Sequence, residues 1–164
     1  MNMFNRLLHT GKLSYLWISI LIIILDQASK LCALSYLTFA MPIKVFPGLN
    51  FSLVYNYGAA FSFLDNSNEV WQVFLFSIIA IVLVIFLFFW LARLSDGHKV
   101  LAIGLCLILG GAIGNLYDRL AYGYVIDFID CYVYKYHWPV FNIADMAICI
   151  GAFFVIISSF KSTK

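Results

Sequence analysis

The chain has 164 residues, of which 64% are hydrophobic and only 11% carry a charge. A soluble domain has about 25% charged and about 45–50% apolar residues, so this composition excludes an ordinary soluble domain and indicates a membrane protein. The net charge of +2, without any basic cluster, excludes a surface that binds nucleic acid. The four cysteines lack CxxC or CxxxC spacing, and we interpret them as small apolar residues.

Four apolar segments predict transmembrane helices. The charge-free runs are 13–25, 70–92, 100–117 and 146–160. The first run would make only about 20 Å of helix, whereas the hydrocarbon core is about 30 Å thick, so this helix has to continue through Asp26. By the same argument the fourth helix has to extend back past Asp145 to about Val140. We therefore predict one membrane domain over 1–164, with transmembrane helices at about 13–34, 70–92, 99–118 and 140–160.

The N-terminal segment has the general form of a signal peptide, because a basic start precedes an apolar stretch. No small-x-small cleavage site follows at a suitable distance, and Lys30 is incompatible with a lipobox at Cys32. We therefore expect the first helix to be retained.

The basic residues predict the orientation of the helices. Six of the ten lie at one end of the predicted bundle: Arg6, Lys12, Arg93, Lys99, Lys161 and Lys164. Because basic loops stay in the cytoplasm, we predict that both termini are cytoplasmic. Seven of the eight acidic residues, all but Asp96, lie at or beyond the opposite ends of the helices.

The first outer connection, from about Ser35 to Glu69, is far longer than a turn. Apolar and polar residues alternate along 49–56, which is the pattern of a half-buried strand. The sequence Phe-Pro-Gly at 46–48 is a turn signal before it. After the strand, we expect a short interfacial helix at 58–64.

The second outer connection, from Leu120 to Pro139, contains another predicted strand at 124–133. Tyr132, Tyr134, Tyr136 and Trp138 have the composition of an aromatic belt at a membrane surface. We expect the two connections to pair. The predicted fold class is therefore an all-α membrane protein: a four-helix transmembrane bundle with a small extracytoplasmic β-sheet formed by the two outer connections.

Three polar residues lie at similar depths on three predicted helices. Counted from the basic ends, Asp26 lies about 21 Å along its helix, and Asn115 and Asp145 lie about 24 Å along theirs. Charged groups at such a depth cost roughly 2.5–3.5 kcal/mol each and are typical of a functional interior. The alternative is that the three serve only as hydrogen-bonding partners between helices. Their convergence at one level favours a site.

Helical spacing supports a polar face on two of these helices. The residues with this spacing are Asn142, Asp145 and Cys149 on the fourth helix and Gly111, Asn115 and Asp118 on the third. The pair Gly110 and Gly114 permits another helix to approach closely, which we interpret as bundle packing.

The absence of other catalytic motifs leaves carboxylate chemistry. The sequence has no GxSxG and no HExxH, and its histidines, His9, His98 and His137, lie in the predicted tail and loops. Two aspartates that share a proton can activate a water molecule and protonate a leaving amine. Asp145 is one candidate, and its partner is Asp127 or Asp130 from the preceding strand.

The strand pattern favours Asp127 as the partner but does not decide the choice. Side chains three positions apart on a strand point to opposite faces, so only one of these acids would face Asp145. Asp127 lies between Ile126 and Phe128, where an unpaired carboxylate would be costly. We interpret Asp130 as an exposed loop acid, or as a partner for Arg119 or Lys135.

Five sequence blocks carry a family resemblance over essentially the whole chain. They are Asp-Gln-Ala-Ser-Lys at 26–30, Asn-Tyr-Gly-Ala-Ala-Phe at 56–61, the run from Gly110 to Arg119, Val-Ile-Asp-Phe at 125–128 and Phe-Asn-Ile-Ala-Asp at 141–145. In this order and at this spacing, the sequence resembles the lipoprotein signal peptidases (signal peptidase II) of bacteria.

The resemblance implies an aspartic endopeptidase that needs no metal or organic cofactor. Its catalytic residues would be Asp127 and Asp145. The residues that match the family's supporting polar positions are Asp26, Asn56, Asn115, Asp118, Arg119 and Asn142. The substrate would be a prolipoprotein with a diacylglyceryl group on its lipobox cysteine, cut just before that cysteine. The expected setting is the bacterial inner membrane, with the site near the outer face among membrane lipids, and the expected oligomeric state is a monomer.

A different class of function also fits four helices with buried acids, namely a proton-coupled exporter or an ion-conducting subunit. Transporters often show internal repeats with broken helices, and the sequence shows none. Such proteins also seldom need a long patterned outer loop. A purely structural membrane subunit is a third possibility, and cleavage of a lipidated proprotein by the purified protein discriminates among the three.

The predicted topology can be tested with reporter fusions. Fusions at Ser52 and Tyr132 should report the outer compartment, and a fusion at Gly97 should report the cytoplasm, because of the distribution of Lys and Arg. A cytoplasmic signal at Ser52 would contradict the topology.

Overall fold

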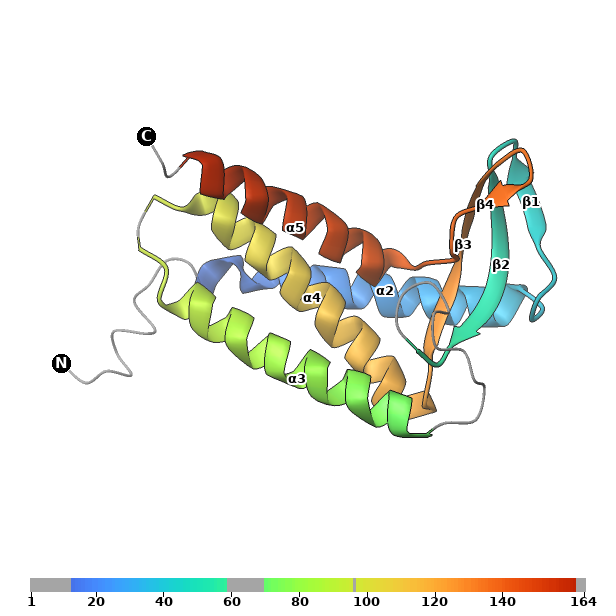
Figure 1. Ribbon diagram of the computed structural model, residues 1–164, viewed down its shortest axis with the longest axis horizontal. Helices are drawn as coiled ribbons and strands as arrows, with labels where there is room; N and C mark the ends of the chain where they lie inside the picture. The colour runs from blue at the N-terminus through green and yellow to red at the C-terminus, as the bar shows by residue number, and fades with distance from the viewer. Residues whose placement is uncertain (1–12, 59–69, 96, 162–164) are drawn as a thin grey trace.

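The computed structural model describes residues 13–58, 70–95 and 97–161. Its elements in chain order are η1 (Leu13–Tyr15), α2 (Leu16–Tyr36), β1 (Ile43–Phe46), β2 (Leu49–Asn56), α3 (Val70–Ala92), α4 (Lys99–Tyr122), β3 (Val125–Val133), β4 (Tyr136–His137) and α5 (Ile143–Lys161). Figure 1 shows the helices side by side, with the strands gathered at one end of the bundle. We call this end the sheet end.

Four helices in the described part of the chain are long and apolar enough to cross a membrane. These candidate spans are Leu13–Tyr36, Trp71–Ala92, Lys99–Tyr122 and Ile143–Phe160. Large apolar side chains are exposed along their outer faces, for example Phe74, Val82 and Phe89 on α3. A bundle that exposes so many apolar groups is stable only where lipid covers them, so the predicted membrane fold is confirmed.

Helix α4 lies at the centre of the bundle because its glycines let two other helices approach its backbone. A Cβ atom on Gly110 would lie 2.9 Å from the backbone oxygen of Ser19 on α2. A Cβ atom on Gly111 would clash with the backbone oxygen of Ala144 on α5. The sequence prediction that Gly110 and Gly114 permit close packing is confirmed, and Gly111 does the same for a second helix.

The half of the bundle away from the sheet is an apolar core. Its buried residues come from α3, α4 and the segment between them: Leu87, Leu91, Leu94, Ala102, Leu105, Cys106 and Leu109. All four cysteines are free, and the burial of Cys106 in this core agrees with its interpretation as a small apolar residue. Polar side chains are concentrated instead in the half of the bundle near the sheet.

The sheet is antiparallel, with strand order β1-β2-β3-β4. Strands β1 and β2 are joined by Pro47 and Gly48, and Gly48 has a φ of +98°, which suits glycine in this turn. The central pair β2 and β3 consists of the two predicted strands, so the expected pairing of the two connections is confirmed. The edge strands β1 and β4 were not predicted, because β1 is exposed along its whole length and β4 has two residues.

Two helix boundaries differ from the prediction by three residues or more. Helix α4 continues one turn past residue 118, to Tyr122, and ends where Gly123 adopts a left-handed conformation. Helix α5 begins at Ile143 rather than at about Val140, because Asn142 caps its first turn. The interfacial helix predicted at 58–64 lies almost entirely outside the described residues.

Candidate active site

The first turn of α5 is fixed by reciprocal hydrogen bonds between Asn142 and Asp145. The Asp145 backbone N–H donates to the Asn142 side-chain oxygen at 2.9 Å, and the Asn142 backbone N–H donates to the Asp145 carboxylate at 3.2 Å. This is a capping box, the arrangement that satisfies otherwise unpaired N–H groups at a helix start. It therefore sets both where the helix begins and where the Asp145 carboxylate lies.

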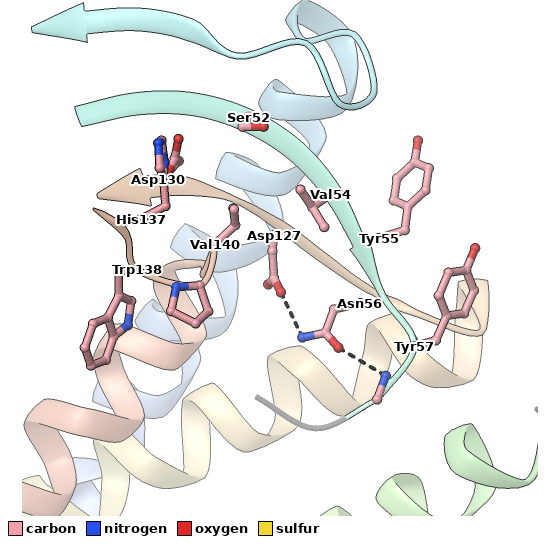
Figure 2. Close-up of a pocket in the computed structure, with 12 residues that line it drawn as sticks. Ser52, Val54, Tyr55, Asn56, Tyr57, Asp127, Asp130, His137, Trp138 and Val140 are labelled. Carbon is pink, nitrogen blue, oxygen red and sulfur yellow. Dashed lines mark hydrogen bonds and ion pairs between the residues drawn. The ribbon is translucent and has the colours of Figure 1, made fainter. Parts of the chain in front are cut away.

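Asn142 also connects α5 to Asp127 on β3. Its side-chain nitrogen donates to the Asp127 carboxylate at 2.7 Å. A second amide, that of Asn56 on β2, donates to the same carboxylate at 3.0 Å, as Figure 2 shows. Asp127 is only 2% exposed, so these donors satisfy a carboxyl group that has little contact with solvent. One amide side chain thus holds one predicted catalytic acid and caps the helix that carries the other.

A buried ammonium group contacts several polar side chains of the site. The Lys30 side chain, on α2, is fully buried and lies 2.7 Å from the Asp26 carboxylate and 2.8 Å from the Asp118 carboxylate. It also donates to the side-chain oxygen of Asn115 at 2.9 Å. Lys30 was not among the predicted site residues, although its spacing of four residues from Asp26 on a predicted helix was a signal for an ion pair.

Asn115 relays this contact to the predicted catalytic residues. Its side-chain nitrogen donates to the Asp145 carboxylate at 2.8 Å, and its oxygen accepts from Asn142 at 3.1 Å as well as from Lys30. The convergence of Asp26, Asn115 and Asp145 expected from their depths is therefore found in the structure, with Lys30 as the group that joins them.

Asp26 and Asp118 connect elements of the fold. Asp26 accepts a hydrogen bond from the backbone N–H of Ala144 in the first turn of α5, at 2.9 Å. Asp118 accepts one from the backbone N–H of Ile126 on β3, at 3.2 Å. Both carboxylates are fully buried, and each links α2 or α4 to an element that carries a predicted catalytic acid.

Arg119 lies beside the predicted catalytic residues, one position after Asp118. Its guanidinium donates to the backbone oxygens of Asn115 and Gly58, each at 3.4 Å, and lies over the Phe76 ring at 5.8 Å from the centroid. Its Nε atom is buried and has no hydrogen-bond partner among the residues that the structure describes. A half-buried, incompletely satisfied cation next to carboxylates is suited to contact a polar group of a substrate.

The structure corrects the interpretation of Asp130. This residue is 5% exposed, and its carboxylate contacts the Nδ1 atom of His137 at 2.7 Å and the Asn50 side chain at 2.9 Å. It is therefore neither an exposed loop acid nor, among the contacts of the described residues, a partner of Arg119 or Lys135.

Asp127 and Asp130 also share one face of the sheet, contrary to the expected alternation. The register of β2 against β3 shifts between Phe51 and Val54, so five residues of β2 pair with four of β3. Asn50 is opposite Asp130 and Val54 is opposite Asp127, and both acids line the same cavity over these two strands. The irregular register thus brings both acids to one side, which the sequence pattern did not reveal.

Two cavities meet at Asp127. The membrane-side cavity, about 490 Å³, runs between α4 and α5 and is lined by Asn115, Arg119, Asp127, Asp145 and the apolar side of α5 from Met146 to Cys149. The sheet-side cavity, about 460 Å³, lies over β2 and β3 and is lined by Ser52, Asn56, Asp127, Asp130 and His137 (Figure 2). Trp138, Pro139 and Val140 border both cavities. Asp130 borders only the second, so Asp127 is the strand acid that shares a cavity with Asp145.

Burial, and after it the nearby Asp145 carboxylate, raise the pKa of Asp127 to about 7. The amide donors Asn56 and Asn142 and the charge of Lys30 act in the opposite direction, because they stabilise the ionised form. A carboxyl group with such a pKa exchanges its proton near neutral pH. No group of three or more His, Cys, Asp or Glu side chains in a metal-binding arrangement occurs among the described residues.

Apolar helices around a buried carboxylate centre at one end define a multi-pass membrane protein. The chain belongs to the signal peptidase (SPase) II family, whose model matches residues 18–161. It is 49% identical over 157 residues to a lipoprotein signal peptidase of Alteromonas mediterranea, with 96% of this chain and 86% of the relative covered. It is also 49% identical over 143 residues to a lipoprotein signal peptidase of Coxiella burnetii, with 87% of each chain covered.

A solved structure of a bacterial membrane enzyme has the same fold. Its TM-score is 0.81 at 30% sequence identity, and the match covers 92% of this chain and 90% of the other. A second such structure matches with a TM-score of 0.80 at 28% identity. The family is a peptidase family, which confirms the resemblance seen in the sequence and decides against a transporter or a purely structural subunit.

The role of Lys30 can be tested by replacing its charge with a side chain of similar length. Lys30→Met should destabilise the folded protein by about 3–5 kcal/mol, because it leaves two buried carboxylates without their cation. Lys135→Met, at an exposed position, is the matched control and should change stability by less than about 0.5 kcal/mol. Thermal unfolding in detergent measures both. Equal stability of the two variants would show that the cluster does not hold the fold together.

Proposed function

We propose that this protein is an intramembrane aspartic endopeptidase that removes the signal peptide from diacylglyceryl-modified prolipoproteins, cutting just before the lipidated cysteine. The family and the names of the curated relatives support the substrate class. The observation that carries the catalytic type is the Asn142 side chain, which binds Asp127 and caps the helix turn that bears Asp145. The two carboxyl groups border one cavity.

The two acids would act as a pair that shares one proton. The ionised carboxylate removes a proton from a water molecule, and the oxygen of that water attacks the carbonyl carbon of the bond to be cut. The protonated carboxyl group then gives its proton to the leaving amine as the carbon–nitrogen bond breaks. Asp127, with a pKa of about 7, is suited to hold the shared proton at neutral pH.

The other predicted site residues would position this pair or bind the substrate. Asn115 and Asn142 orient the two carboxylates, and Asp26 and Asp118 hold the elements that carry them. Arg119 and Asn56 border the membrane-side cavity, where their donors would contact backbone oxygens of the substrate. In this role the amides act through preorganisation, because their positions are fixed before the substrate binds.

The position of the site suits a substrate that is anchored by lipid. The membrane-side cavity is bordered by Met146, Ile148 and Cys149 of the spanning helix α5, so a signal peptide and acyl chains would reach the acids from the bilayer. The distribution of basic residues favours cytoplasmic termini and a site near the outer face of the bacterial inner membrane. A monomer would suffice, because one chain supplies both acids.

The catalytic pair is tested with three matched substitutions. Asp127→Asn and Asp145→Asn should each lower turnover of a lipidated proprotein by roughly 10³-fold or more, because neither variant can share a proton between two carboxyl groups. Asp130→Asn should keep turnover within roughly tenfold of the wild type, because Asp130 does not border the cavity that holds Asp145. Circular dichroism serves as the folding control. An inactive Asp130→Asn variant beside an active Asp127→Asn variant would refute the pair.

The pH dependence of kcat/KM tests which group holds the proton. Since Asp127 has to be protonated to act as the acid, kcat/KM should fall as the pH rises above about 7. Asn56 lowers the pKa of Asp127, so the Asn56→Ala variant should show this fall at a higher pH. A variant that merely lost structure would lower the rate at every pH. An alkaline limb that stays in place in Asn56→Ala would contradict the assignment.

A further inference from the structure

Apart from Asp127 and Asn56, the residues that line the sheet-side cavity have no role in the bond cleavage described above. The cavity begins at Asp127, where it meets the membrane-side cavity, and extends along β2 and β3 to Asp130 and His137 (Figure 2). The membrane-side cavity leads the other way, along the spanning helix α5. The proposed catalytic acids therefore lie between a largely apolar cavity at the bilayer and a polar cavity at the sheet.

The two cavities match the two sides of the bond that would be cut. On the proposed function, the signal peptide lies before this bond and stays in the bilayer, whereas the mature polypeptide follows it and leaves toward water. The membrane-side cavity would therefore hold the signal peptide, and the acyl chains of the cysteine after the bond would lie in the bilayer beside it. The sheet-side cavity is left for the first residues of the mature polypeptide.

Three side chains from three strands form a hydrogen-bonded cluster at this cavity. Asp130 and His137 line the cavity, and Asn50 contacts Asp130. The buried Asp130 carboxylate on β3 accepts from Asn50 on β2 and contacts Nδ1 of His137 on β4. The His137 ring also stacks on Tyr132, with centroids 5.1 Å apart and an interplanar angle of 20°. These contacts fix the imidazole, although 51% of the His137 side chain is exposed. Because Asp130 occupies Nδ1, the other ring nitrogen, Nε2, is left for a substrate.

The distance from the proposed catalytic pair to this cluster sets which residues would reach it. Asp130 is three positions from Asp127 along β3, which corresponds to about 10 Å. An extended substrate also advances by about 3.3 Å per residue, so about three residues span this distance, and the cluster would meet approximately the second to fourth residues of the mature polypeptide.

We propose that the Asn50–Asp130–His137 cluster is a binding subsite for the mature side of the substrate, an extended polar polypeptide segment that follows the lipidated cysteine. His137 contacts the segment and influences which sequences are cut efficiently. Asp130 is a positioning residue that acts by holding His137. This inference rests on the proposed function, and it assigns the cluster to substrate selection, separate from bond cleavage.

Two lipidated substrates with the same signal peptide test the proposal on the full-length protein. One ends as an amide directly after the cysteine, and the other continues with four uncharged polar residues. Wild-type protein should cut the extended substrate with the higher kcat/KM. His137→Ala and Asp130→Asn should reduce this advantage by roughly three- to tenfold, the scale of one or two hydrogen bonds, and should leave the truncated substrate unaffected.

Two matched variants control for indirect effects. His98→Ala removes the same side chain from the opposite end of the bundle, and Tyr136→Ala changes the neighbouring residue of β4. Both should keep the full advantage of the extended substrate. Thermal unfolding is measured for all variants, and the half-exposed His137 carries the test if Asp130→Asn is unstable.

Each other outcome overturns the proposal. A wild type without preference for the extended substrate, variants that keep the preference, or variants that lose both substrates equally would show that the cluster only joins the strands. If wild-type protein cuts neither substrate, the proposed function itself fails. If it cuts both and the variants behave like the wild type, only the subsite assignment fails.

Discussion

The structure depends on one buried ammonium group, that of Lys30. It contacts Asp26 on its own helix and Asp118 and Asn115 on α4, while the two carboxylates accept backbone N–H groups from α5 and β3. A single cluster therefore connects α2, α4, β3 and α5 at the sheet end. Buried ion pairs rarely stabilise a fold more than well-packed apolar residues would, but removal of one partner is costly. The cluster therefore serves mainly to specify how these elements meet, because an incorrect alignment would leave a charge unpaired inside the membrane.

The side-chain amides of two residues connect this cluster to the proposed catalytic residues and fix their positions. Asn115 connects Lys30 to Asp145, and Asn142 connects Asp127 to the start of α5. The two acids nevertheless have different surroundings. Asp127 is 2% exposed on a strand, whereas Asp145 is only partly buried in the first turn of a helix. Carboxyl groups in unequal environments can divide the roles of acid and base, since the environment decides which of them keeps the proton. The asymmetry thus follows from the fold.

Much of the fold and of the site could be predicted from the sequence, because both depend on where charges are tolerated. Charge-free runs located the spanning helices, and counting residues along them brought Asp26, Asn115 and Asp145 to one level. The errors arose where a tertiary contact overrides a local pattern. Asn142 looked like a helical residue but caps the helix instead. Asp127 and Asp130 share a face because the register of β2 against β3 is irregular, and no periodicity in one strand can show this. Lys30 was considered as an obstacle to a lipobox and as part of a matching sequence block, but it was not predicted as a site residue, although its carboxylate partner lies one turn away.

On the proposed function, the location of the site follows from its two reactants, water and a lipid-anchored substrate, which are stable in different environments. Hydrolysis needs water, but the signal peptide of the proposed substrate and the acyl chains on the cysteine that follows it are stable only in lipid. Deep in the bundle the apolar core around Leu105 excludes water, and on the far side of the sheet acyl chains would be exposed to it. Asp127 lies at the boundary between these regions, because β3 begins within a few residues of the end of α4 and packs against the start of α5. A carboxyl group at this junction borders both cavities, so on the proposed function it lies between the part of the substrate in the bilayer and the part in water. The short connection through Gly123 fixes this placement, because a longer one would let the strand move away from the end of the bundle.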